Sequence, residues 1–333
     1  MKILRIFIKI FLVSAFVLSC TSNDKYITIT GYAQGGTYAV KLNMNGTDGM
    51  IKTRPEAIRD SIDSILTEID NTLSGYNNNS ILSRLNAGEA VEWNDMMKDI
   101  FAHSTRIQAE TKGAVDVAAG PLFDLWGFGF KSGEFPSDEE VRQIKETSNL
   151  EYYTSQEKGK LNFNAIAQGY SCDLVAEYLY SLGVKDMMVD IGEIFCDGHN
   201  PSGKPWSLGI DKPIDGNNEL GAQIQGIFRA PDGPHGIVTS GNYRKFYIKD
   251  GKKYSHTIDP RTGYPVTHNL LSATIVAEDA MMADAYATYC MVIGLEESKI
   301  FLESRTDLEG CLIYDEDGQF KTWCSEGFVL EEL

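Results

Sequence analysis

The sequence predicts an α+β protein in which antiparallel sheets pack against helices. Residues 55–73 place isoleucines and leucines at the spacing of an amphipathic helix, and residues 280–293 form a second long helix. From Asp186 onward, short apolar runs are separated by Gly and Pro turns, which is typical of short strands. Strands and helices do not alternate as in βαβ units, so the pattern argues against a doubly wound fold.

The N-terminal half begins with a predicted hairpin. Residues 26–42 alternate in polarity and are interrupted by Gly35-Gly36. The helix over residues 55–73 follows, and the stretch LSGYNNNSILSRLN after it indicates a polar loop leading into a short helix. Residues 96–111 form another predicted helix, which Gly113 closes.

The remaining elements are shorter. KSGEFPSDEE is an acidic connector that predicts an inserted loop and helix, and NAIAQGYSCDLVAEYLYSLG predicts a strand exit followed by a helix that ends at Gly183. The runs WSLGI, IQGIFRA, GIVTS and KFYI are predicted strands, and a hairpin closes the chain. Without repeats or a low-complexity linker, the expected organisation is a signal peptide (1–19), a tether (20–30) and a single domain (31–333).

The first residues have the composition of an export signal. Lys2, Arg5 and Lys9 accompany the apolar run FLVSAFVL, which ends at Ser19-Cys20 and is short for a transmembrane helix. The ending VLSC resembles the bacterial lipobox, in which the cysteine becomes the lipidated first residue. The sequence therefore predicts an exported lipoprotein anchored through Cys20 and facing the periplasm, with an ordinary signal peptide as the alternative.

The charge of the chain limits its partners. The formal net charge is −17, and it becomes −20 once residues 1–19, which carry three positive and no negative charges, are removed. So acidic a protein repels nucleic acid and gains nothing from anionic lipid, so membrane attachment would rest on acyl chains.

The five cysteines after Cys20 show no C-x-x-C spacing, which argues against a zinc site and a thioredoxin-like pair. Most lie in apolar runs, which favours buried free thiols. A disulfide between Cys311 and Cys324, across the C-terminal hairpin, is the alternative left open.

Asp284 and Thr288 are the first candidates for chemistry. They lie four residues apart in the predicted last helix, which puts both side chains on one face. One anionic and one neutral oxygen suit a hard cation such as Mg²⁺. On spacing alone, an aspartate facing solvent and a threonine bonded to its own backbone are the favoured explanation of the pair.

His256 is the second candidate. It lies in YSHTIDPRTGYP, where Pro260 and Gly263 mark a tight turn after a strand. A histidine can take a proton from an attacking hydroxyl, although it can also simply bond the turn. Tyr76 in the SGYN loop could stack on a planar ligand, with ordinary packing as the alternative.

Several familiar sites are missing, since the chain contains no P-loop, no G-x-G-x-x-G, no G-x-S-x-G and no H-E-x-x-H. A ligand bearing phosphate would have to be held in another way, and a metal is the obvious one for an acidic protein.

Taken together, the motifs resemble the ApbE-type FAD:protein FMN transferases from about Gly35 to Gly294. The segments that carry the likeness are, in order, GTYAV, SGYNNNSILSRLN, AVDVAAGPLFDLWGFG, AIAQGYSCDLVAEYL, DIGEIFCDGHNPSGKPWSLGIDKP, TSGNYRKFYIKDGKKYSHTIDPRTGYP and AEDAMMADAYAT. SHTIDPRTG followed by ADAYAT is the most specific pair.

The resemblance implies an activity. Such enzymes cleave the pyrophosphate of FAD, attach FMN through its phosphate to a Thr or Ser of a target protein, and release AMP. The target would be a membrane electron-transport subunit of the Na⁺-translocating NADH:quinone reductase or a related type. The family Mg²⁺ would be held by Asp284, Thr288 and the carbonyl of Ala165, and His256 would activate the acceptor hydroxyl.

The same matching implies an FAD pocket, with Tyr76 stacked on a ring of FAD. Its other contributors would be Gly35, Ala114, Val115, Asp116, Asn162, Gln168 and Ile258. Asn162 and Gln168 replace an acidic residue and a lysine of the family pattern, and the double glycine of the family is one short at Ile191-Gly192-Glu193. An FAD pyrophosphatase and a flavin-binding lipoprotein without catalysis remain as alternatives.

These motifs lie far apart along the chain, so the site needs loops from both halves. The expected fold is therefore two closely packed α/β lobes with mixed or antiparallel sheets and a flavin cleft between them.

Overall fold

A computed structural model describes residues 25–129, 135–156, 158–214, 221–243, 246–249 and 252–333. The expected signal peptide and Cys20 lie outside the described residues. In the part that is described, no helix is both long enough and apolar enough to span a membrane.

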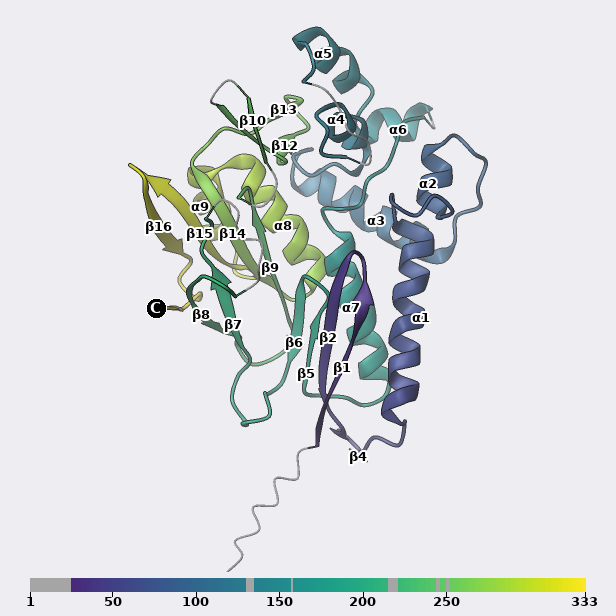
Figure 1. The fold of residues 1–333 in the computed structure, drawn as a ribbon, viewed down its shortest axis with the longest axis vertical. Helices are drawn as coiled ribbons and strands as arrows, with labels where there is room; N and C mark the ends of the chain where they lie inside the picture. The colour runs from purple at the N-terminus through teal and green to yellow at the C-terminus, as the bar shows by residue number, and fades with distance from the viewer. Residues whose placement is uncertain (1–24, 130–134, 157, 215–220, 244–245, 250–251) are drawn as a thin grey trace, which may run out of the picture.

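One eight-stranded antiparallel sheet runs through the molecule (Figure 1). Its order is β1-β2-β5-β6-β9-β14-β15-β16. The strands are β1 (Tyr26–Ala33), β2 (Gly36–Asn43), β5 (Met187–Asp190), β6 (Ile194–Asp197), β9 (His235–Gly241), β14 (Leu270–Ala277), β15 (Glu309–Glu316) and β16 (Gln319–Cys324). The α+β class with antiparallel sheets is confirmed, and the two expected lobes share this one sheet.

Helices cover one face of the sheet. The long ones are α1 (Pro55–Leu73), α3 (Asp95–Glu110), α7 (Ala167–Ser181) and α8 (Ala280–Ile293). Helix α8 packs on β9 and β14, and α7 packs on β6 and against α8. The shorter helices are α2 (Ile81–Asn86), η1 (Val117–Ala119), α4 (Gly120–Leu125), α5 (Asp138–Glu146), α6 (Leu150–Gln156) and α9 (Leu295–Glu303).

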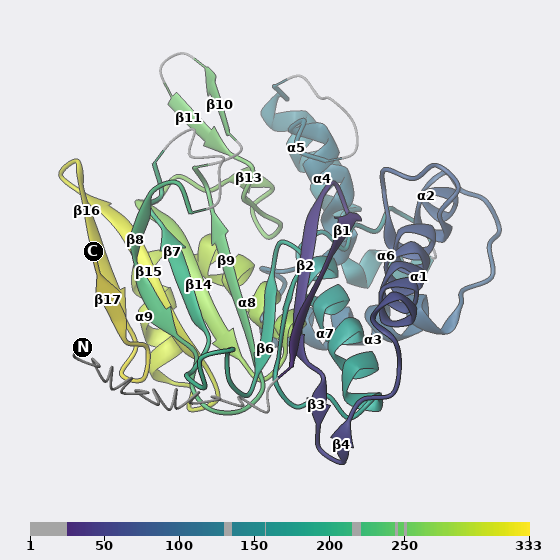
Figure 2. The ribbon, with the colours of Figure 1, turned by 60° about the horizontal axis from the view of Figure 1, so that its bottom comes forward.

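A smaller sheet covers the other face. It has the order β17-β8-β7, formed by β7 (Ser207–Asp211), β8 (Ile224–Arg229) and β17 (Leu330–Glu332). Its buried side chains share an apolar cluster with β6, β9, β14 and β15. Figure 2 shows β7 and β8 on the side of the main sheet away from α1 and α7. Three two-stranded hairpins complete the fold: β3 (Asn45–Gly46) with β4 (Gly49–Met50), β10 (Phe246–Lys249) with β11 (Lys252–Ser255), and β12 (Ile258–Asp259) with β13 (Tyr264–Pro265).

The burial of the elements follows from these layers. Strand β14 is covered on both faces, and its sequence LLSATIVA is correspondingly apolar and almost entirely buried. Helix α8 is apolar nearly all round, which is typical of a helix enclosed in a core. Asp284 is the one charged residue in the α8 sequence AMMADAYATYCMVI, so its position needs a physical reason.

The structure departs from the sequence expectations at a few points. Strand β1 begins at Tyr26, so residues 26–30 of the expected tether belong to the sheet. Residues 158–163 are irregular and residues 164–166 form a turn before α7, in place of the predicted strand exit. Helices α6 and α9 and strands β14 and β17 were not among the predicted elements.

Gly236 allows α8 to lie directly on the sheet. A Cβ at this position would lie 2.3 Å from the backbone N of Ala280. We expect Gly236→Ala to push the start of α8 away from β9 and to cost about 1–3 kcal/mol, the usual range for overpacking. Gly36→Ala is the matched control, because a Cβ there meets nothing within 4 Å. Thermal unfolding of the two variants tests this; equal melting temperatures would contradict it.

Candidate functional site at the junction of α7 and α8

The site begins where α7 and α8 cross. A Cβ at Gly169 would lie 2.2 Å from the carbonyl oxygen of Ala280, so only glycine permits this approach. The backbone N–H of Gly169 donates to Oδ2 of Asp284 at 3.2 Å. The glycine of the sequence AQGYS therefore connects α7 to the only acidic side chain of α8.

Asp284 is a buried carboxylate with few groups around it to stabilise its negative charge. Only 5% of the residue is exposed. Burial raises the pKa of Asp284 well above its usual value; the Gly169 amide opposes the rise and the nearby Asp173 adds to it. Because ionised carboxylates are costly to bury without a partner, a cation beside Asp284 would remove this penalty.

The neighbouring oxygens suit a hard cation. Thr288 lies one turn further along α8 and is half-buried. Ala165 lies in the turn that leads into α7, four residues before the Gly169 amide that reaches Asp284. Among the described residues, no group of three or more His, Cys, Asp or Glu side chains could hold a metal. A set of one carboxylate, one hydroxyl and one carbonyl fits a cation that keeps several waters, as Mg²⁺ does.

Asp173 was not predicted from the sequence, and it helps to place α8. Its Oδ1 accepts from the N–H of Ala280 at 2.8 Å, and its Oδ2 accepts from Met281 at 2.9 Å. These are free amides of the first turn of α8, which such a carboxylate satisfies. Burial raises the pKa of Asp173 to about 7, opposed by these two bonds. The visible signal was an aspartate in α7, one helical turn after Gly169.

The turn between β1 and β2 lies over the start of α7. Gln34 and Gly35 both have positive φ, 51° and 81°, which tightens the turn. The Nε2 of Gln34 donates to the Oγ of Ser171 on α7 at 2.5 Å. A Cβ at Gly35 would meet nothing within 4 Å, so this predicted pocket residue faces open space.

Gln168 lies beside Gly192, the single glycine that replaces the family pair. Its Nε2 donates to the carbonyl of Ile191 at 3.4 Å. A Cβ at Gly192, where φ is 95°, would lie 2.7 Å from that Nε2. The remaining glycine thus provides both a left-handed backbone and room for the glutamine side chain.

The predicted residues 114–116 and Asn162 are neighbours. The N–H of Asn162 donates to the carbonyl of Val117 at 2.7 Å, and its Oδ1 accepts from Asn164 at 2.9 Å. Ala114, Val115 and Asp116 are buried. The carboxylate of Asp116 accepts from the amides of Ala118 and Leu150, and burial raises its pKa. This carboxylate therefore holds the surrounding loops together.

The turn that follows His256 is held rigidly. The guanidinium of Arg261 donates to both carboxylate oxygens of Asp259 at 2.9 Å, and the amide of Gly263 donates to the Asp259 carbonyl at 2.8 Å. Trp126, which is buried, donates its indole N–H to the Gly263 carbonyl at 2.9 Å. The turn expected from the sequence is present, and an ion pair between Asp259 and Arg261 reinforces it.

His256 lies between β11 and β12 beside α8. It is half-buried, and its ring centroid lies 6.5 Å from that of Phe128. Two residues further on, Ile258 is buried against Leu122 and Trp126. Strand β12 contacts α8, the helix that carries Asp284. The histidine segment and the Asp284 helix therefore belong to one region of the molecule.

Tyr76 differs from the other predicted residues because it is 68% exposed. It lies in the loop between α1 and α2, where the Oγ of Ser74 accepts from its amide at 3.3 Å. At the end of α2, Asn86 exchanges two hydrogen bonds with the backbone of Leu161, next to Asn162. The segment is thus attached to the site region, and the tyrosine is largely exposed.

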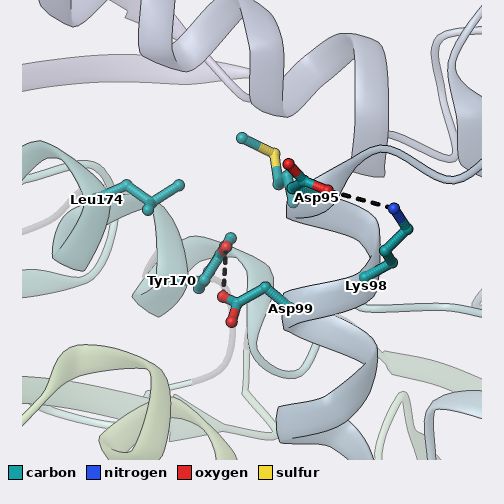
Figure 3. Close-up of a pocket in the computed structure, with 6 residues that line it drawn as sticks. Asp95, Lys98, Asp99, Tyr170 and Leu174 are labelled. Carbon is teal, nitrogen blue, oxygen red and sulfur yellow. Dashed lines mark hydrogen bonds and ion pairs between the residues drawn. The ribbon is translucent and has the colours of Figure 1, made fainter.

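The structure also contains a hollow away from the predicted site residues. A hollow of about 620 Å³ lies between α3 and α7 and is lined by Asp95, Met96, Lys98, Asp99, Tyr170 and Leu174 (Figure 3). The hydroxyl of Tyr170 donates to Oδ2 of Asp99 at 2.8 Å across it. No predicted site residue lines this hollow, so it is not the expected flavin cleft.

Comparison with known proteins identifies the chain. It is 34% identical over 298 residues to the FAD:protein FMN transferase of Escherichia coli K12, covering 84% of this chain and 83% of that protein. It is 32% identical to the Haemophilus influenzae protein of the same name, covering 93% and 92%. Among solved structures, the flavin transferase ApbE from Vibrio cholerae matches with a TM-score of 0.76 at 30% identity, covering 91% and 98%. The apo Pseudomonas stutzeri flavinyl transferase ApbE matches with 0.77 at 31%, covering 91% and 95%.

The fold is thus that of a flavin transferase. The description of the ApbE family matches residues 34–312, and the chain belongs to this family. The resemblance inferred from SHTIDPRTG and ADAYAT is confirmed.

Proposed function

We propose that this flavin transferase depends on Mg²⁺, cleaves FAD, and attaches FMN through a phosphoester to a Thr or Ser of a target protein, with AMP as the leaving group. The buried carboxylate of Asp284 is the observation that supports a bound Mg²⁺. It accepts one described hydrogen bond, from the Gly169 amide, and has a strongly raised pKa. A bound cation would stabilise the ionised form of such a buried carboxylate.

Asp284, Thr288 and the carbonyl of Ala165 would hold the Mg²⁺. When bound, the ion would neutralise the pyrophosphate and polarise the attacked phosphorus. The rest of the arrangement positions these ligands: Gly169 permits the close approach of α7 to α8, and Asp173 holds the first turn of α8.

His256 would take the proton of the acceptor hydroxyl as it attacks. The Asp259–Arg261 pair and the Trp126 bond fix the turn that follows it, which would limit the movement of the histidine backbone. Gly35, Tyr76, residues 114–116, Asn162, Gln168 and Ile258 would form the FAD pocket. For Asp116 this role would fall to its backbone, since its carboxylate binds two amides.

The acceptor and the compartment follow from the sequence expectations. We infer an exported lipoprotein that modifies a membrane electron-transport subunit, of the Na⁺-translocating NADH:quinone reductase or a related type. Cys20→Ser should remove acyl-chain labelling and release the protein from the membrane fraction. The export signal is intact in this variant, so the two effects report the anchor; unchanged attachment would contradict a lipid anchor at Cys20.

The transferase is tested by incubating the protein with FAD, Mg²⁺ and a periplasmic and membrane extract, and scanning a denaturing gel for flavin fluorescence. We expect a fluorescent band that requires both FAD and Mg²⁺. Release of AMP without any acceptor and without a band would favour the FAD pyrophosphatase. Retention of uncleaved FAD in the presence of Mg²⁺ would favour a flavin-binding protein without catalysis.

A further inference from the structure

We propose that Cys311 and Cys324 form a disulfide that fastens the outermost strand of the main sheet to its neighbour. Strand β16 lies at the edge of the sheet and pairs with β15. In the register of this pair, Cys311 and Cys324 are directly opposite each other. Both are free thiols in the structure.

The position within the ladder suits a disulfide. The N–H of Ser325 donates to the carbonyl of Gly310 at 2.9 Å, so that neighbouring pair is hydrogen-bonded. Cys311 and Cys324 therefore occupy the next, non-hydrogen-bonded position, where Cα atoms are about 4.5 Å apart and side chains come closest. Disulfides need a Cα separation of about 4.4–6.8 Å, so the bond requires no movement of the strands.

Both thiols point to the same side of the sheet. Cys311 is fully buried in the apolar cluster beneath β7 and β8, and the half-buried Cys324 packs against that cluster. A hydrogen bond between the two thiols lowers the pKa of Cys324, while the same bond and burial raise the pKa of Cys311. Cys324 is thus the more accessible and the more readily ionised of the two.

A disulfide such as oxidised glutathione can serve as the oxidant. The thiolate of Cys324 attacks the oxidant disulfide, forms a mixed disulfide and releases one glutathione thiolate. Cys311 then loses its proton and attacks the Sγ of Cys324, which releases the second glutathione thiolate. Two protein thiols are oxidised, and one glutathione disulfide is reduced to two thiols.

The other cysteines among the described residues, Cys172, Cys196 and Cys290, have no cysteine opposite them in a strand pair. Cys196 lies opposite Met188 on β5 and His235 on β9, while Cys172 and Cys290 are on helices in the core. All three are buried, and burial raises the pKa of each thiol. Oxidation should therefore be selective for the hairpin pair.

The bond would hold the C-terminal end of the chain in place. The residues after Cys324 return to the small sheet, where Phe328 stacks on Phe228 with ring centroids 4.2 Å apart. Arg229 also pairs with Glu331 at 2.8 Å. Edge strands are the strands that separate most easily, so a cross-link here would stabilise both β16 and the segment that follows it.

The test uses the full chain, reduced, freed of reductant, and then treated with oxidised glutathione without denaturant. Trypsin cuts at Lys321, between the two cysteines, so the disulfide would join the peptides 306–321 and 322–333. We expect this joined pair in the mass spectrum, two fewer alkylatable thiols, and a melting temperature higher by several degrees than that of the reduced protein.

Cys172→Ser is the matched control and should keep the joined peptides and the rise in melting temperature. Cys324→Ser should lose both. Two separate, fully alkylatable peptides after oxidation of the folded wild-type protein would overturn the proposal. A disulfide that joins Cys324 to any other cysteine would overturn it as well.

Discussion

Asp284→Ala is expected to lower Mg²⁺-dependent release of AMP from FAD by about a thousandfold or more. Charge stabilisation by a metal is worth several kcal/mol, and each 1.36 kcal/mol is a factor of ten in rate. Without the carboxylate, the FAD pyrophosphate would face an acidic protein with no cation to neutralise it; the full wild-type chain has a formal net charge of −17. Binding of the metal–FAD complex should fall together with the rate.

Asp284→Asn separates this effect from misfolding. The amide oxygen can still accept from the Gly169 N–H, and the buried group can no longer ionise. Because burial already disfavours the charge, this variant should be at least as stable as the wild type without Mg²⁺. Full Mg²⁺-dependent turnover in either variant would contradict the metal assignment.

His256→Ala is expected to slow transfer of FMN to the acceptor by about 10² to 10⁴, the usual contribution of a general base. FAD binding should be unchanged, because His256 would act on the acceptor hydroxyl. The measurement compares flavin transfer with FAD affinity in the same preparation. His103→Ala is a suitable control, since its ring lies on α3 with Asp99 as its nearest ionic neighbour at 3.8 Å. A loss of FAD affinity equal to the loss of rate would contradict the role of general base.

Long, uniform elements of the fold could be predicted from the sequence. The bounds of α1 and α8 agree with the prediction because each is a single run of consistent periodicity with a clear start. Helices α6 and α9 have only seven and nine residues, which is too few for a periodic signal, whereas the similarly short α2 and α5 follow recognisable polar loops. The order of strands in the sheet depends on contacts between distant segments, which local pattern does not contain.

The site residues also fall into two groups: those that the sequence indicates and those whose role depends on packing. Asp284, Thr288 and His256 could be proposed from the sequence because their side chains have suitable chemistry at a suitable spacing. Ala165 would contribute only its carbonyl, so nothing in its residue type indicates a ligand. The importance of Gly169 and Asp173 lies in two close approaches to Ala280, which exist only once α7 and α8 are packed together.

The buried carboxylate of Asp284 is proposed to hold one divalent cation. Calorimetric titration of Mg²⁺ into the wild-type protein and Asp284→Asn, each saturated with FAD and corrected for Mg²⁺ binding to FAD alone, tests it most directly. We expect one Mg²⁺ per wild-type chain and no saturable binding to the variant. Equal stoichiometry and affinity in the two proteins would contradict it.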